Sequence, residues 1–169
     1  MDCHGRMLRM PSNLFARTSG FVLPLAVVLL IALTFPLSRR ADSDPWTKAQ
    51  TVQPAELAKE LRAPKTAPKV VFVGFKRLYS AGHIKGAEYH GTAGSEAGLK
   101  ELTAWAVGVP RSTNLVIYCG CCPMERCPNI RPAFTALQAL GFRNLRVLLL
   151  QQDFATDWAG KGLPYEKGE

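Results

Sequence analysis

The sequence predicts an α/β domain with an open, mainly parallel sheet flanked by helices, preceded by an N-terminal hydrophobic helix. Its 169 residues, of which 47% are hydrophobic and 20% charged, have room for one packed domain and an appendage but not for two large domains. From Val52 onward, short apolar runs alternate with segments of helical periodicity, a pattern typical of strands connected by helices. A long uncharged apolar run near the N-terminus stands apart from this pattern.

Residues 1–40 are predicted to form a signal peptide or a transmembrane anchor. The 21 residues between Arg17 and Arg39 carry no charged side chain, which is about the length that a helix needs to cross a bilayer. Arginines precede the apolar run, as they do in both kinds of segment. Both interpretations place the protein in the cell envelope, exported and either membrane-anchored or periplasmic. Residues 41–51 then form a polar linker, and residues 52–169 form the domain.

The elements of the domain are predicted in order along the chain. Runs rich in β-branched residues predict buried strands, and apolar residues spaced about four apart predict amphipathic helices. The predicted helices are 54–62, 98–107, 132–140 and 153–158, and the predicted strands are 69–75, 115–118 and 145–150, with a two-glycine turn at 82–87. Strands joined by helices favour parallel pairing, which places ligands at the carboxyl ends of the strands.

The formal net charge of +8 does not indicate a nucleic-acid partner. Half of this excess lies in residues 1–40, and the rest is dispersed without a basic run or a stripe of interleaved aromatic residues. We therefore expect no nucleic-acid binding.

Four of the five cysteines lie in one loop, Cys119–Cys127 (CGCCPMERC), between a predicted strand and a predicted helix. The surrounding glycine, proline and charged residues indicate an exposed turn rather than a packed core. A helix beginning near Ile130 directs its unpaired amides at this loop, and Arg126 and Arg131 add positive charge. These features predict that Cys119, at the strand end, is a reactive thiolate.

From Val52 to Glu169 the sequence resembles the rhodanese family of sulfurtransferases. The resemblance is carried by VFVGFKRLYSAGHIKGA, LVIYC, the helix that ends in LGF, and DWAGKGLPYEKG. It implies a parallel α/β sheet with a nucleophilic cysteine, here Cys119, at the end of a strand. That cysteine would take a sulfane sulfur from a donor such as thiosulfate, become a persulfide, and pass the outer sulfur to an acceptor. Loop amides and a helix N-terminus would stabilise the anionic persulfide.

The sequence departs from this family at several positions. Ten residues, not about six, separate Cys119 from the next helix, and Pro123 and Pro128 lack amide hydrogens that could bind an anion. Each proline also disfavours helical geometry at the preceding cysteine, so we expect a stretched loop. Gly74 replaces a commonly acidic residue, and Gln151-Gln152 replaces a glycine pair.

Three functions fit the four thiols. A sulfurtransferase would use Cys119 as the nucleophile and bind its substrate with Arg126, Arg131 and Gly120. A thiol-disulfide or persulfide relay would add Cys121, Cys122 or Cys127 as a resolving thiol. A metal-binding module would use Cys119, Cys121, Cys122 and Cys127 as ligands for zinc or copper(I), although one short segment makes a cramped tetrahedral site.

The predicted partners follow from the sulfurtransferase interpretation. They are a small sulfur-containing anion or a low-molecular-weight thiol, a protein thiol as a further acceptor, and a membrane through the N-terminal segment. The interpretation requires no cofactor.

Overall fold

A computed structural model describes residues 44–168. The predicted signal peptide or anchor and the start of the predicted linker lie outside these residues. Within residues 44–168, no helix has the length and apolar character needed to cross a membrane.

The centre of the domain is a parallel sheet, as the sequence predicted. Its five strands lie in the order β1, β6, β5, β2, β4, and every neighbouring pair is parallel. The strands are β1 (Thr51–Val52), β2 (Lys69–Phe72), β4 (Glu88–Tyr89), β5 (Leu115–Tyr118) and β6 (Leu145–Leu148). Every residue of β5 is buried, because this strand has neighbours on both sides and helices over both faces.

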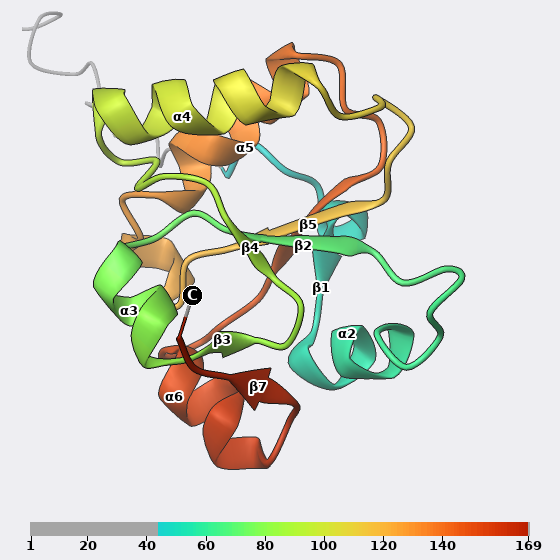
Figure 1. The fold of residues 1–169 in the computed structure, drawn as a ribbon, viewed down its shortest axis with the longest axis vertical. Helices are drawn as coiled ribbons and strands as arrows, with labels where there is room; N and C mark the ends of the chain where they lie inside the picture. The colour runs from blue at the N-terminus through green and yellow to red at the C-terminus, as the bar shows by residue number, and fades with distance from the viewer. Residues whose placement is uncertain (1–43, 169) are drawn as a thin grey trace, which may run out of the picture. The chain divides into compact units, whose positions relative to one another are not determined.

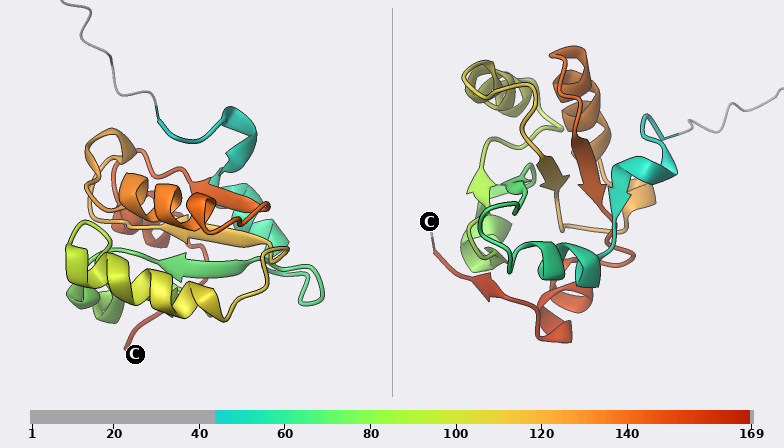
Figure 2. Two further views of the ribbon diagram at one scale, coloured as in Figure 1. Left: turned by 90° about the horizontal axis from the view of Figure 1, so that it is seen from above. Right: turned by 90° about the vertical axis from the view of Figure 1, so that its right-hand side faces the viewer.

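Helices cover both faces of the sheet (Figure 1). The helices are α2 (Pro54–Glu60), α3 (Lys76–Ala81), α4 (Glu96–Val107), α5 (Ile130–Ala139) and α6 (Phe154–Asp157). α4 and α5 lie side by side on one face, whereas α2, α3 and α6 lie on the other (Figures 1 and 2). Each face contributes its own cluster of buried apolar side chains, so the sheet separates two cores.

The shortest elements were not predicted from the sequence. β1 and β4 have two residues each, as do β3 (His83–Ile84) and β7 (Tyr165–Glu166), which pair antiparallel in a separate small sheet. α3 was also missed, because the apolar run before it was interpreted as a strand reaching residue 75, whereas β2 ends at Phe72. The predicted turn at 82–87 contains β3.

Part of the segment predicted as a linker packs against the domain. The Trp46 side chain is buried and meets the Phe134 ring edge-on, with 5.4 Å between ring centroids. A 3-10 turn (Lys48–Gln50) then leads into β1. Trp46 therefore contributes to the packed core although it lies before residue 52, and a single tryptophan within a polar segment gives no periodicity to detect.

Candidate active site: a thiol cluster at the carboxyl end of β5

Cys119 directly follows β5, and its sulfur lies inside the protein. Only 4% of the residue is exposed. Gly74, which follows β2, provides the space for this sulfur, since a Cβ atom at Gly74 would lie 2.8 Å from both the Sγ and the carbonyl oxygen of Cys119. The glycine that replaces an acidic residue of the rhodanese pattern is therefore a steric requirement of the buried thiol.

The loop after Cys119 curls back instead of stretching, which corrects the sequence-based expectation. A 3-10 turn at Met124–Arg126 lies between the two prolines and reverses the chain. The backbone amide of Cys127 donates to the carbonyl of Met124, while Cys127 itself is extended, as expected for a residue before proline. The proline effect on Cys127 was predicted correctly, but the turn places the Cys127 side chain next to Cys119.

The four cysteines are all free thiols, and their sulfur atoms gather at one place. The Cys119 and Cys121 sulfurs are 3.1 Å apart, and so are the Cys121 and Cys122 sulfurs. The sulfurs of Cys119, Cys121 and Cys127 all lie within 4.8 Å of one another. Cys119 and Cys127 are buried, whereas Cys121 and Cys122 are partly exposed. We call these four residues the thiol cluster.

The surroundings of the thiol cluster favour a thiolate on Cys127 and disfavour one on Cys119, the residue that the sequence predicts to be the thiolate. A hydrogen bond from the Cys119 thiol, together with the backbone amides of Asn129 and Ile130, lowers the pKa of Cys127 to about 6 against the opposing effect of burial. The hydrogen bond with Cys127 and burial raise the pKa of Cys119, so that this residue keeps its proton. Burial and neighbouring sulfurs raise the pKa of Cys122 to about 12.

The N-terminus of α5 explains this preference for Cys127. The first amides of a helix lack partners within the helix and carry partial positive charge. The Cys127 sulfur accepts two such amides, those of Asn129 and Ile130, and so occupies the position of a helix-capping acceptor. The N-terminus of α5 therefore stabilises a thiolate, as the sequence predicted, but it does so at Cys127 rather than at Cys119.

Asn129 is a site residue that the sequence analysis missed. It is buried, its side-chain amide donates to the Cys119 sulfur at 3.1 Å, and its Oδ1 accepts from the Gly94 amide at 2.8 Å. Asparagine commonly caps helices, but the Asn129 side chain makes no capping bond in α5. The sequence signal that could have identified Asn129 was its position two residues after Cys127 and directly before a predicted helix start.

The two predicted substrate-binding arginines, Arg126 and Arg131, make no recorded contact with the cysteine sulfurs in residues 44–168. The Arg131 guanidinium donates to the Asp44 carboxylate and to the Met124 carbonyl. Arg126 is exposed at the end of the 3-10 turn. The positive environment of the cluster therefore consists of backbone amides, and Asn129 supplies a neutral donor.

Gly120, the third predicted substrate-binding residue, positions the loop. Its φ of 73° lies in the left-handed region, and a Cβ atom there would lie 2.8 Å from the Phe154 Cβ. Its carbonyl accepts the Phe154 amide at 3.1 Å and so links the cysteine loop to α6.

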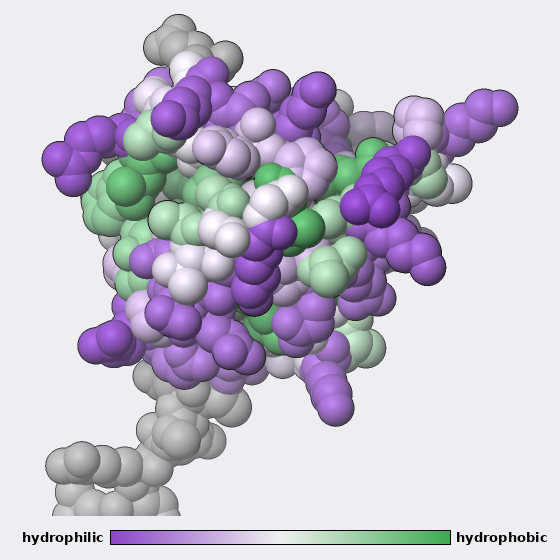
Figure 3. All heavy atoms as spheres, turned by 90° about the horizontal axis from the view of Figure 1, so that it is seen from below, coloured by the Kyte–Doolittle hydropathy of each residue, from purple (hydrophilic) through white to green (hydrophobic). Residues whose placement is uncertain are grey.

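An open cavity of about 350 Å³ adjoins the thiol cluster. Its walls are mainly apolar side chains of α3 and α6 with Tyr165 of β7, and Gly120 and Cys121 form part of the lining. Figure 3 shows the molecule from the side of α6 and β7, where apolar side chains reach the surface among hydrophilic ones. Cys119, Cys122 and Cys127 line a separate cavity of only about 10 Å³.

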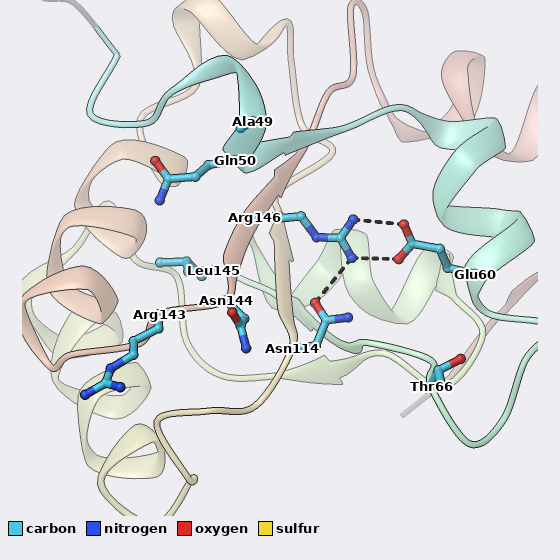
Figure 4. A pocket seen from close by; sticks show the side chains of 9 residues that line it. All are labelled: Ala49, Gln50, Glu60, Thr66, Asn114, Arg143, Asn144, Leu145 and Arg146. Atoms are coloured by element: carbon cyan, nitrogen blue, oxygen red, sulfur yellow. Dashed lines mark hydrogen bonds and ion pairs between the residues drawn. The ribbon is translucent and has the colours of Figure 1, made fainter.

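A larger cavity, of about 550 Å³, lies at the opposite edge of the sheet, where β5 and β6 begin (Figure 4). Three of its polar side chains are paired with one another: the Arg146 guanidinium makes two bonds to the Glu60 carboxylate and a third to Asn114. None of the four thiols lines it.

No protein-family model matches the sequence, and no curated protein matches it. Solved structures do match. A rhodanese-like domain from Anabaena sp. is 21% identical, with a TM-score of 0.52 over 70% of this chain and 79% of that one. A second structure of the same Anabaena protein is 19% identical, with a TM-score of 0.54 over 69% of this chain and 92% of that one.

The chain has a rhodanese-like fold. A thiosulfate sulfurtransferase from Pseudomonas aeruginosa also matches, at 22% identity with a TM-score of 0.52. The match covers 75% of this chain but only 21% of that protein, so this chain spans about a fifth of its length. In this rhodanese-like fold, Cys119 follows a central strand of the sheet, at the place where the sequence resemblance implied a nucleophilic cysteine.

Proposed function

We propose that the domain transfers sulfane sulfur through the thiol cluster and that Cys119 carries the sulfur as a persulfide. The observation that carries the proposal is the gathering of the Cys119, Cys121 and Cys127 sulfurs, within 4.8 Å of one another, at the carboxyl end of β5. This end of a parallel strand is the usual location of ligand sites in α/β folds. The rhodanese-like fold supports the proposal as an analogy of fold.

Cys119 and Cys127 share one proton through a hydrogen bond. When this proton moves onto Cys127 as the donor binds, the Cys119 sulfur becomes the thiolate that attacks a sulfane sulfur. With thiosulfate as the donor, the new S–S bond forms on Cys119, the S–S bond of thiosulfate breaks, and sulfite leaves with the electron pair. The side-chain amide of Asn129 remains as a donor to the charged product.

Mass spectrometry of the intact protein and its peptides tests the proposal. Exposure of the reduced, metal-free protein to thiosulfate should add one sulfur atom, located on Cys119, and addition of a thiol or cyanide should remove it. The Cys119→Ser variant should gain no stable sulfur. Loss of two hydrogens without any gain of sulfur would instead assign a disulfide relay, and it would overturn the proposal.

A second function is favoured by one observation. Three cysteine sulfurs within 4.8 Å of one another, two of them buried, make a compact soft-ligand set of the kind that binds copper(I) or zinc. The nine-residue loop provides this set because its 3-10 turn folds Cys127 back. Metal analysis of protein purified without chelators, compared with Cys121→Ser, tests this function. A stoichiometric metal that is lost in the variant supports it, and metal-free protein rejects it.

We also propose that the domain acts outside the cytoplasm. The support is the uncharged apolar run of residues 18–38 with arginines before it. A reporter enzyme that is active only after export, fused after residue 169, should be active with the full chain and inactive when residues 1–40 are removed. Equal reporter activity of the two fusions would reject export by this segment.

A further inference from the structure

We propose that the open cavity beside Cys121 binds a sulfane-sulfur donor that has an apolar, ring-sized body and a single negative charge, and that Cys121 is the thiol that first receives the sulfur. This inference rests on the proposed sulfur transfer. It adds the class of donor and the point at which sulfur enters the cluster.

The position of Cys121 is the first support. Of the four thiols, Cys121 is the one that lines the 350 Å³ cavity, whose size is within the range of small-molecule sites. Cys119 and Cys127 are nearly closed to solvent, since each is only 4% exposed. A donor larger than a few atoms therefore meets Cys121 before it meets either partner.

The lining of the cavity indicates the chemistry of the donor. Phe72 and Phe154 contribute aromatic walls, and Tyr165 meets Phe154 edge-on with 6.3 Å between ring centroids. Aromatic side chains pack well against another ring, in offset or edge-on geometry. One basic and one acidic side chain, Lys167 and Asp153, also line the cavity. Asp153 caps α6 by accepting the Thr156 amide, and Lys167 offers a positive charge to an anionic group. Thiosulfate, which is small and doubly charged, uses none of the aromatic surface.

The distance between two sulfurs provides the route inward. Cys121 gives its proton to the Cys127 thiolate and attacks the sulfane sulfur of a thiosulfonate, whose S–S bond breaks so that a sulfinate leaves with the electron pair. Cys119 then attacks the outer sulfur of the Cys121 persulfide. The S–S bond to Cys121 breaks, and the departing Cys121 sulfur takes the proton of Cys119. The Cys119 and Cys121 sulfurs are 3.1 Å apart, so this second transfer needs little movement.

Two donors with the same reactive group provide the test. Benzenethiosulfonate and methanethiosulfonate both carry a transferable sulfur and one negative charge, but only the first has a ring. The rate constant for loading one sulfur onto the full-length, metal-free protein is measured with each donor by mass spectrometry. We expect the aryl donor to load about tenfold faster, as expected for burial of part of a ring in an apolar site.

Matched variants separate the cavity from the rest of the cluster. Cys121→Ser should lose most of the preference for the aryl donor, whereas Cys122→Ser, the adjacent thiol outside this cavity, should keep it. Tyr165→Ala should reduce the preference several-fold. Phe75→Ala is its control, because Phe75 is a comparably exposed aromatic residue that does not line the cavity: Phe75 is 47% exposed and Tyr165 is 44% exposed.

The outcomes distinguish this inference from the function on which it rests. If wild-type protein gains no sulfur from either donor, the proposed function fails. If it gains sulfur but loads both donors equally, or if Cys121→Ser keeps the aryl preference, sulfur transfer stands and this inference is overturned.

Discussion

The two edges of the sheet differ in how their polar groups are used. At the edge where β5 and β6 begin, the cavity is larger, but its one carboxylate, Glu60, is paired with Arg146 through two hydrogen bonds. At the carboxyl edge the space is smaller, and the thiols bond chiefly to each other and to amides of α5. A thiolate on Cys127 has no cationic side chain bonded to it and can take part in a reaction, whereas the Glu60 carboxylate is held by Arg146 and stabilises the fold. Cavity size alone would therefore select the edge that holds the Arg146–Glu60 ion pair and not the edge that holds the thiols.

The strongest test of this difference exchanges an amide for a carboxylate at each edge. Asn129→Asp replaces the donor to Cys119 with a negative charge beside the thiol cluster, so sulfur loading should fall about 100-fold, as when one donor to a developing anion is removed. Asn114→Asp at the other edge places the carboxylate next to Arg146, where it should be tolerated. Loading rates of the two variants check this. Equal rates would show that Asn129 does not support the charged sulfur.

Steric space should be critical at the thiol edge. In Gly74→Ala the added methyl group would overlap the Cys119 sulfur, so we expect a loss of about 1 to 3 kcal/mol in the free energy of unfolding. Gly108→Ala is the control, because Gly108 has a φ of −80° and its nearest neighbour would lie 3.7 Å from the new Cβ. Urea unfolding measures both. A Gly74→Ala variant as stable as Gly108→Ala would mean that Cys119 is not packed against Gly74.

Stability should follow the charge of the cluster as pH changes. A Cys127 thiolate with a pKa of about 6 binds no proton at neutral pH, whereas an unfolded cysteine with a pKa of about 8.5 does. The free energy of unfolding should rise between these two values by at most about 1.4 kcal/mol per pH unit. Above about pH 9 it should fall, because native Cys119 and Cys122 keep protons that the unfolded chain loses. Cys127→Ser should abolish the rise.

The smallest effect is expected at the other edge. Arg146→Met removes a partly buried ion pair and should cost about 1 to 2 kcal/mol in unfolding free energy. It should leave the rate of sulfur loading unchanged, since Arg146 contacts none of the thiols. Arg146 lowers the pKa of Glu60. The difference in unfolding free energy between wild-type protein and this variant should therefore disappear as pH falls through the Glu60 pKa. A variant with impaired loading would contradict the separation of the two edges.

The sequence predicted the long elements because they carry periodicity. The strand 115–118 was placed at its exact bounds, and α5 begins at Ile130, where a helix start was expected. Strands of two residues, such as β1 and β4, carry no period, and they form only through pairing with distant partners.

The site was predicted less completely than the fold, because its chemistry depends on contacts between loop residues. The cysteines and the helix start were visible in the sequence, but the position of the charge depends on the turn at Met124–Arg126 and on two amides of α5. No local pattern distinguishes Cys127 from Cys119 in this respect. Gly74 is a departure from the rhodanese pattern that the sequence could not explain. The structure explains it, because the Cys119 sulfur occupies the space that a side chain at Gly74 would need.

A thiolate on Cys127, at the N-terminus of α5, is the feature on which the proposed sulfur transfer depends. It can be followed through the ultraviolet absorbance of thiolate as a function of pH in reduced, metal-free protein. We expect one thiolate to appear with a midpoint near pH 6, and we expect this step to be absent in Cys127→Ser but present in Cys122→Ser. Absorbance that rises only near pH 8.5, as for ordinary cysteines, would contradict it.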